Sequence, residues 1–374
     1  MSFTLTVSDA DGEARLDRFL RRRFPSLAQG RLEQLLRKGA IRLNEAKAKS
    51  SDRVKPGDAV LVPYGLDKEP DEDEGRARPK VSDRDADLVR GLVLHDDGEV
   101  LVLNKPPGIA VQGGTRTTRH LDAMVAALAD GGDVPKLAHR LDRDTSGVLV
   151  FGRTPAAAAF LARAFQSRQT EKIYWAVVLG VPSPRAGEVR SWMAKGGSAR
   201  DPDREIMRLA KQNDEGAVFA ITHYAVLANA AQRAAFVGLK PETGRTHQLR
   251  FHMSQMGHSI LGDRKYVCDR ETPTELAEGL HLHARALAIP HPSGKILKVV
   301  APLPEHMQAT FEALGFSERD APDPFAAFVG VKSKNARARE RQAAEAAAPT
   351  APTKPVRTTP KAAQAPGGRR GRVR

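Results

Sequence analysis

Short apolar segments with strand-like patterns recur along the middle of this chain, from Leu92 to Phe316. They are rich in aliphatic and β-branched residues, which favours strands over helices. Strands are predicted over 100–103, 173–179 and 234–239. Helices are fewer: Thr154 is a predicted N-cap of an Ala-rich helix ending at Phe165, and a second helix is predicted over 246–256. Without a regular strand–helix alternation, we expect an α+β domain on a mixed, largely antiparallel sheet.

Both ends of the chain are strongly basic, within a formal net charge of +14. Residues 15–63 hold thirteen Lys and Arg against five acidic residues, and residues 332–374 hold twelve against two. A basic surface of this kind predicts a polyanionic partner, with nucleic acid the first candidate. The alternative is that the charge serves solubility alone.

Residues 1–65 form a predicted small α/β domain. Leu16, Phe19 and Leu20 share one helical face, a second helix runs from Gln29 to Lys38, and short strands follow. The segment resembles the RNA-binding domain of ribosomal protein S4 in these motifs: Arg15-Leu16-Asp17, Arg31, Leu35 to Gly39, Asn44, and Val54 to Asp58. The resemblance implies RNA contacts by exposed cations, namely Arg18, Arg31, Arg37 and Lys38. A solvated helical hairpin is the alternative.

Three further segments follow from composition. Residues 66–90 are rich in acidic residues, Arg and Pro, which predicts a flexible linker. Residues 91–318 form the predicted main domain. Residues 319–374 shift to Ala, Pro, Thr, Lys and Arg without periodicity, which predicts a disordered basic tail.

The segment from His139 to Gly147 carries two carboxylates, two arginines and a histidine, and it leads into the apolar run Val148 to Phe151. A charged turn at the start of a buried strand is typical of a functional site. By itself the turn is ambiguous, because Asp144 could be a surface cap and His139 a packed side chain.

The same segment resembles the signature of the RluA-type pseudouridine synthases. Further blocks agree in order, so that the resemblance spans residues 14–306: Asn104 to Gly108, Lys172 to Tyr174, Gly244 to Arg250, Gly257-His258, Gly262-Asp263 with Tyr266, Leu282 to Ala284, and Ala301 to Pro304. The closest resemblance is to the bacterial enzymes that modify several uridines in 23S rRNA. It implies a pseudouridine synthase fold and the isomerisation of uridine to pseudouridine in RNA.

The resemblance also implies roles for individual residues. Asp142 would be the catalytic carboxylate, and Arg245 its salt-bridge partner. Tyr174 would lie against the target base, and Arg140 would fill the gap left by a uridine that leaves the stack. For Arg245, Tyr174 and Arg140 the alternatives are an architectural ion pair, a core tyrosine and a phosphate contact.

Other motif residues have weaker assignments. Asn104, Lys105 and Lys172 are expected to flank the pocket and contact RNA. His139, His247 and His283 are expected to make structural hydrogen bonds rather than to transfer protons.

The reaction is an isomerisation, so no cofactor is expected, and the sequence shows neither a phosphate-binding loop nor clustered metal ligands. The lone Cys268 and the lack of a long apolar run predict a cytoplasmic protein outside the membrane. Nothing in the sequence demands more than a monomer.

Two other functions compete with this hypothesis. A catalytically inert RNA-binding factor for ribosome assembly would be expected to have lost Asp142, Tyr174 or Arg245, and this chain keeps all three. A nucleosidase would need a second carboxylate, for which Asp144 is the candidate, but it would not explain the basic N-terminal domain. The sequence leaves the target uridines and the covalent step open.

Overall fold

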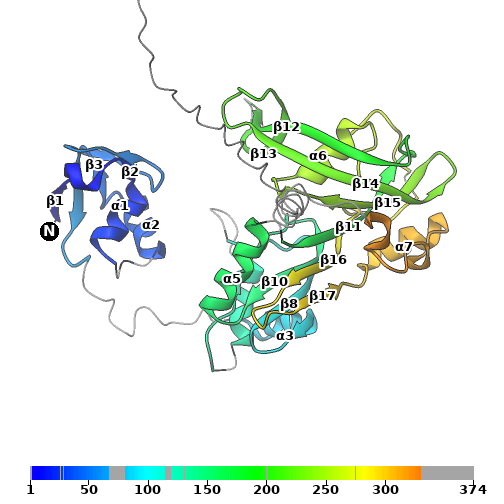
Figure 1. Ribbon diagram of the computed structural model, residues 1–374, viewed down its shortest axis with the longest axis horizontal. Coiled ribbons are helices and arrows are strands. Elements are labelled where there is room, and N and C mark those ends of the chain that lie inside the picture. Colours follow the sequence, from blue (N-terminus) through cyan, green and yellow to red (C-terminus); the bar gives the residue numbers. More distant parts are fainter. Residues whose placement is uncertain are drawn as a thin grey trace, which may run out of the picture. The chain divides into compact units, whose positions relative to one another are not determined.

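The computed structural model describes residues 2–25, 27, 29–66, 81–113, 119–129, 131–167, 169–198, 201–273 and 275–329. The chain divides into two compact units between Ser82 and Asp83 (Figure 1).

The N-terminal unit packs two helices against short strands. The helices are α1 (Leu16–Arg23) and α2 (Gln29–Lys38). One sheet has the order β1 (Ser2–Thr6), β6 (Ala59–Pro63), β3 (Arg42–Leu43), β4 (Ala46–Lys47); β2 (Ala14–Arg15) pairs with β5 (Arg53–Val54), and a 3-10 turn η1 spans Asp9–Asp11. The core contains Leu16, Phe19 and Leu20, which confirms the predicted buried face of α1.

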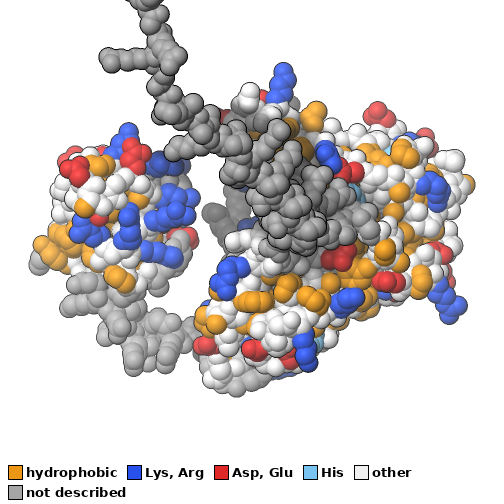
Figure 2. Space-filling model, in the orientation of Figure 1, with side chains coloured by type: hydrophobic (Ala, Val, Ile, Leu, Met, Phe, Trp, Pro, Cys, Tyr) orange, Lys and Arg blue, Asp and Glu red, His pale blue; other side chains and the backbone are white. Residues whose placement is uncertain are grey.

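The predicted RNA-binding cations of this unit are all exposed: Arg18, Arg31, Arg37 and Lys38. Lys and Arg side chains gather on the visible face of the unit (Figure 2). Because α1 and α2 bury their leucines, their charged residues are directed to solvent.

The second unit is built on an 11-stranded sheet of mixed direction, which confirms the expected α+β architecture. Its main order is β13 (Asp201–Ala210), β12 (Ala186–Ser198), β14 (Val218–Ala230), β15 (Ala234–Pro241), β11 (Glu171–Leu179), β16 (Leu282–Pro290), β10 (Ser146–Gly152), β8 (Val100–Lys105), β7 (Val93–Asp96). Two further strands join it: β17 (Ile296–Val300) pairs with β16 and β9 (Lys136–Leu137) with β10. The β10–β16 pair is parallel, whereas the other pairs are antiparallel.

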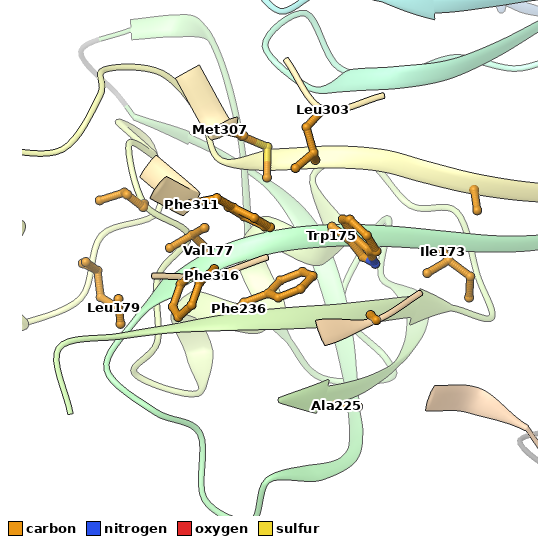
Figure 3. Packing of buried hydrophobic residues seen from close by; sticks show 14 of the residues in the cluster. Ile173, Trp175, Val177, Leu179, Ala225, Phe236, Leu303, Met307, Phe311 and Phe316 are labelled. Carbon is orange, nitrogen blue, oxygen red and sulfur yellow. The ribbon is translucent and has the colours of Figure 1, made fainter. Parts of the chain in front are cut away.

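Strand β11 is buried on both faces, so its alternate residues enter different cores. Trp175 packs with Phe236 of β15, and Phe236 packs in turn with Phe311 of α7 (Glu305–Leu314), at ring-centroid distances of 4.9 Å and 4.8 Å (Figure 3). Ala176 instead joins a cluster with Met253 of α6 (Gln248–Gln255). Helices α6 and α7 therefore cover opposite faces of this part of the sheet.

The strands near β10 are covered in the same two-sided way. Helix α5 (Pro155–Gln166) places Leu161 against Val100 and Val102, and Thr154 caps it by accepting a hydrogen bond from Ala157 N, as predicted. On the other face Val89 packs with Leu101. Val89 belongs to α3 (Asp83–Gly91), and the short helices α4 (Leu121–Met124) and η2 (Val125–Leu128) lie beside it.

Two predicted boundaries are wrong. Residues 83–90, assigned to the linker, form α3, because Ala86 and Val89 give this charged segment a buried apolar face. Residues 319–329, assigned to the tail, include η4 (Ala326–Phe328) after η3 (Glu318–Asp320), and Phe328 is buried in the core around Trp175. The rest of the predicted linker and tail, residues 67–80 and 330–374, lies outside the described residues.

Among the described helices, none is both long enough and apolar enough to cross a membrane.

Candidate active site

A cavity of about 870 Å³ opens where the turn before β10, strand β11 and the segment leading into α6 meet. Five predicted site residues line it: Arg140, Asp142, Lys172, Tyr174 and Arg245. His139 and His247, which were expected to make structural hydrogen bonds, line it as well. Motifs more than 100 residues apart therefore converge on one site, as the resemblance implied.

The turn carrying Asp142 is fixed by a close approach of two strands. Gly147 of β10 lies opposite Ala284 of β16 in the parallel pair. Its φ of 109° lies where L side chains rarely go, and a Cβ there would be 2.3 Å from the Ala284 carbonyl oxygen. Only glycine fits, and the tight contact sets the position from which the turn projects into the cavity.

Lys105 is buried beneath this turn and does not face the cavity. Its ammonium donates to the carbonyl oxygens of Pro106 at 2.8 Å, Arg143 at 2.7 Å and Thr145 at 2.9 Å. Burial lowers the pKa of Lys105 to about 7, although the charges of Asp144 and Asp142 and the three acceptors favour the ammonium form. The structure therefore places Lys105 under the turn, where its ammonium holds three carbonyl groups, and not at the cavity where an RNA contact was expected.

Asn104 is also used within the protein. Its side-chain amide donates to the Pro302 carbonyl at 3.3 Å, which ties the end of β8 to the loop before α7. It is not among the residues that line the cavity, in contrast to the expectation. Lys172 of β11 and Arg140 of the turn before β10 do line the cavity, as do Lys195 and Arg245.

The cation nearest to the Asp142 carboxylate belongs to Arg250, on α6. Arg250 Nη1 lies 4.0 Å from Asp142 Oδ2. The same guanidinium is held by Asp263 in a bidentate pair, with both N–O distances 2.7 Å, and both side chains of that pair are buried. Arg250 is therefore a fixed positive charge beside the Asp142 carboxylate.

Arg245 does not form the predicted salt bridge. Its side chain donates from Nε to the Phe219 carbonyl at 3.3 Å, and its backbone N–H donates to Gln248 Oε1 at 3.1 Å. Among the described residues, the basic groups within 4.0 Å of Asp142 are those of Arg250 and His247. Arg245 remains at the cavity wall, where it can meet substrate phosphate or base.

Tyr174 enters the cavity from β11. The register of β11 against β16 shifts between Ile173 and Trp175, so Tyr174 stands at an irregularity of the kind that redirects side chains beside active sites. Burial, with the charge of Asp142 adding to it, raises the Tyr174 pKa well above its ordinary value. The phenol is therefore neutral near pH 7 and can donate a hydrogen bond.

Two of the predicted histidines have structural roles, as expected. His139 Nε2 accepts a hydrogen bond from Val150 N, and burial lowers the pKa of His139 to about 3. His283 Nδ1 contacts Ser146 Oγ at 2.9 Å, and burial lowers its pKa to about 3 as well. Both rings are neutral at physiological pH and support β10.

The third histidine lies at the start of α6, opposite the turn that carries Asp142. His247 Nε2 is 3.9 Å from Asp142 Oδ2, and His247 Nδ1 is 2.9 Å from the Tyr266 hydroxyl. Tyr266 also accepts a hydrogen bond from Met207 N at 2.7 Å. Its hydroxyl therefore connects the long β12–β13 hairpin to the site.

A group that sequence reasoning missed lies on the strands beside the cavity. Glu188, His223 and Glu242 each offer an atom that could bind a metal ion, and these three atoms lie within 4.8 Å of one another. Glu242 also lines the cavity. His223 Nε2 is 2.9 Å from Glu242 Oε1. The three residues are far apart in the sequence and share no spacing motif, so only the pairing of β12 with β14 and of β14 with β15 reveals them.

Comparisons with known proteins identify the family of the chain. Residues 99–255 match the family described as RNA pseudouridylate synthase, and residues 14–60 match the S4 domain. The chain is 32% identical over 303 residues to ribosomal large subunit pseudouridine synthase C of Rickettsia bellii, covering 78% of this chain and 95% of the relative. The enzyme of the same name from Escherichia coli is 31% identical over 318 residues, covering 82% and 95%.

Among solved structures, human RNA pseudouridylate synthase domain containing 4 is similar, with a TM-score of 0.52 and 30% identity. The match covers 62% of this chain and 97% of the human one. The alignments cover 95% of each bacterial relative, and both domains match known families. Together these findings assign the chain to a family. The chain belongs to the RNA pseudouridine synthases, isomerases that act on RNA, and it carries an S4 domain ahead of the catalytic one.

Proposed function

We propose that this protein isomerises uridines of the large-subunit (23S) rRNA to pseudouridine, with Asp142 as its catalytic carboxylate. The observation that carries the proposal is the position of Asp142. Its side chain is 30% exposed at the cavity, and it faces the buried guanidinium of Arg250 at 4.0 Å. An accessible carboxylate beside a fixed cation is suited to chemistry at an electron-poor sugar carbon.

The reaction itself needs no outside reagent. The bond between ribose C1′ and base N1 breaks, the base rotates, and a bond forms between C1′ and C5. The proton on C5 is then lost, while N1 ends up protonated, so atoms and electrons balance without a cofactor. Asp142 would act either by attack on C1′ or through a glycal formed by proton removal from the sugar; both routes use the same ionised carboxylate.

Other cavity residues have complementary roles in this proposal. The neutral phenol of Tyr174 would lie against the base and donate a hydrogen bond, which suits a group whose pKa is raised. Arg140, exposed beside Asp142, would fill the gap in the RNA stack, since flipping a base costs a few kcal/mol. Lys172 and Arg245 would contact the phosphates or the base from the cavity wall.

The proposed target rests on two observations. The relatives are named for the large ribosomal subunit, and the N-terminal unit matches a domain first known from a ribosomal protein and exposes the four predicted cations. On this proposal the protein works in the cytoplasm, as a monomer and without a cofactor, because neither the chemistry nor the site calls on a second chain.

The test uses the full-length protein and 23S rRNA lacking modifications. Asp142→Asn keeps the shape of the side chain but removes its charge, so isomerisation should fall to background while RNA binding remains. Asp144→Asn is the matched control: Asp144 is an exposed carboxylate two residues away, in the same turn but outside the cavity lining. This variant should stay active.

Turnover by Asp142→Asn above background would refute the catalytic assignment. Loss of activity in both variants would instead point to paired carboxylates, as in a nucleosidase. If the wild-type protein modifies another RNA but leaves the uridines of 23S rRNA unchanged, the proposed target is wrong and the catalytic role stands. A wild-type protein that binds rRNA and modifies no RNA would indicate an assembly factor.

A further inference from the structure

His247 stands between Asp142 and Tyr266, with a different ring nitrogen facing each. Nε2 lies 3.9 Å from Asp142 Oδ2, and Nδ1 lies 2.9 Å from the Tyr266 hydroxyl. The imidazole is buried, with 8% of the residue exposed. In a buried neutral ring the two nitrogens differ, one donating and one accepting, so their neighbours decide where the proton resides.

The hydrogen bonds of Tyr266 decide this question. The Met207 backbone N–H can only donate, so at 2.7 Å the Tyr266 oxygen must accept from it. The phenol proton is then available for Nδ1 of His247. Burial raises the pKa of Tyr266 to about 12, so the phenol keeps that proton near neutral pH. An Nδ1 that accepts leaves the imidazole proton on Nε2.

The neighbour on the other side favours the same arrangement. With the proton on Nε2, the N–H dipole points toward the Asp142 carboxylate. With the proton on Nδ1, a nitrogen lone pair would face the carboxylate. The Tyr266 oxygen would then accept from both Met207 N and Nδ1, and the phenol proton would lose His247 as its acceptor. Both sides of the ring therefore select the same tautomer.

The backbone at His247 is also held in an uncommon state. Its φ of 52° and ψ of 19° are left-handed, and they turn the chain into α6. A histidine in this region is strained compared with glycine, and such strain persists where the surroundings fix it, often at functional sites. Here it aims the ring of His247 at Asp142 and, one helical turn later, leaves Arg250 facing the same carboxylate.

We propose that His247 is a positioning residue for Asp142: Tyr266 keeps its proton on Nε2, and this N–H orients the carboxylate for reaction beside Arg250. The distance of 3.9 Å between Nε2 and Oδ2 shortens to a hydrogen bond when substrate fills the cavity, as catalytic hydrogen bonds commonly do. The proposal rests on the assignment of Asp142 as the catalytic carboxylate. In metal sites, loss of a group that orients a ligand typically costs on the order of 10- to 100-fold in activity, and we expect a loss of similar size here.

The first test reads the tautomer directly. Full-length protein labelled with ¹⁵N in its histidines is studied by NMR at pH 7.5, and the His247 signals are assigned by their loss in His247→Asn. The proposal expects the Nε2–H form. In Tyr266→Phe, which lacks the phenol proton, Asp142 still favours the Nε2–H form, so the Nδ1–H fraction should rise above that of the wild type without replacing Nε2–H. An Nδ1–H or doubly protonated His247 in the wild type, or an Nδ1–H fraction that does not rise in Tyr266→Phe, would overturn the proposal.

The second test compares two amides in kinetics. His247→Asn suits the left-handed backbone but places its nitrogen near the Nδ1 position, whereas His247→Gln reaches the Nε2 position with a donor. We expect kcat to fall roughly 10- to 100-fold in the Asn variant, with KM changed less than about twofold, and to recover partly in the Gln variant. Equal losses in both, or a loss confined to KM, would show a merely structural histidine.

The two tests separate this proposal from the assignment of Asp142. If Asp142→Asn stays active, the catalytic role fails, but the NMR spectrum still reports which nitrogen of His247 carries the proton. If Asp142→Asn is inactive and His247→Asn is fully active, the catalytic role stands and the positioning role fails. Thermal unfolding of each variant, compared with the wild type, identifies any that do not fold.

Discussion

Arg250 faces Asp142 at 4.0 Å while its other guanidinium nitrogens hold Asp263 in a buried bidentate pair. The cation is thus fixed before any substrate arrives, and its position owes nothing to RNA. Preorganised charge of this kind stabilises a developing or persistent opposite charge without reorganisation during the reaction. Asp142 therefore faces a cation whose position is already set by α6 and Asp263.

The first prediction separates the two arginines of one motif. Arg250→Lys should lower kcat about 100-fold or more, because a lysine cannot hold Asp263 in a bidentate pair and present a second nitrogen to Asp142. Arg245→Lys should cost less than about tenfold, since Arg245 lies at the cavity wall and donates to Phe219. Steady-state kinetics on one rRNA fragment compares them. A larger loss of kcat in Arg245→Lys than in Arg250→Lys would instead support the salt bridge between Arg245 and Asp142 that the sequence predicted.

The second prediction concerns the close approach of β10 and β16 at the end of the turn that carries Asp142. Gly147→Ala should destabilise the protein by about 2 kcal/mol or more and abolish activity, because its Cβ would meet the Ala284 carbonyl at 2.3 Å at a φ of 109°. Gly91→Ala is the control: no atom lies within 4 Å of a Cβ built there, at the end of α3. Urea unfolding and activity are measured together. An active, stable Gly147→Ala protein would mean that the two strands can separate at little cost.

The third prediction is a loss of stability in mild acid. Burial lowers the pKa values of His252 and His281 to about 4 and that of His283 to about 3, from an ordinary 6.5. Between these values and 6.5 the unfolded chain binds protons that the folded chain refuses, so stability is full above pH 6.5 and falls as the pH drops. Each histidine contributes about 1.4 kcal/mol per pH unit in that window.

Urea unfolding at pH 7.0 and at 5.5 tests this. His283→Gln should reduce the pH dependence by at most about one quarter, since His139 is a fourth histidine whose pKa burial lowers, to about 3. A free energy of unfolding that does not change between the two pH values would contradict the prediction.

The fourth prediction addresses RNA binding by the N-terminal unit. Replacing its four exposed cations together by glutamine, at Arg18, Arg31, Arg37 and Lys38, should weaken rRNA binding. It should also flatten the salt dependence by roughly 0.7–0.9 in logarithmic slope for each phosphate that the variant no longer neutralises. Arg319→Gln, in the exposed η3 turn, serves as the control. Equal slopes for wild type and quadruple variant would show that these residues do not touch the phosphates.

The sequence predicted the elements whose patterns are local. The N-cap at Thr154, the buried face of α1 and the strand at β8 follow from side chains a few residues apart, and all three are observed. The convergence of the motifs on one cavity followed from the family resemblance. These elements were predictable because local patterns report helix and strand propensity and the periodicity of apolar residues.

Other features depend on which segments meet. Arg245 and Arg250 lie in the same motif, and the left-handed turn at His247 decides which of them faces Asp142. From the sequence Lys105 resembles a surface cation, but in the structure its ammonium donates hydrogen bonds to three carbonyl groups. Phe328 lies in an Ala- and Pro-rich segment whose composition resembles a tail, yet it fills a gap in the core. In each of these cases the residue's role depends on a contact with a segment far away in the sequence, which a local sequence pattern does not report.

The parallel pair between β10 and β16 has a consequence for the timing of synthesis. Ser146 and His283 touch across 137 positions of the chain. The ribosome delivers β10 long before β16, so the strand that seats the Asp142 turn waits without that neighbour until most of the chain has been made. A nascent chain therefore carries Asp142 before it carries the strand that supports the Asp142 turn. Competence for catalysis arises only late in translation, after β16 has emerged.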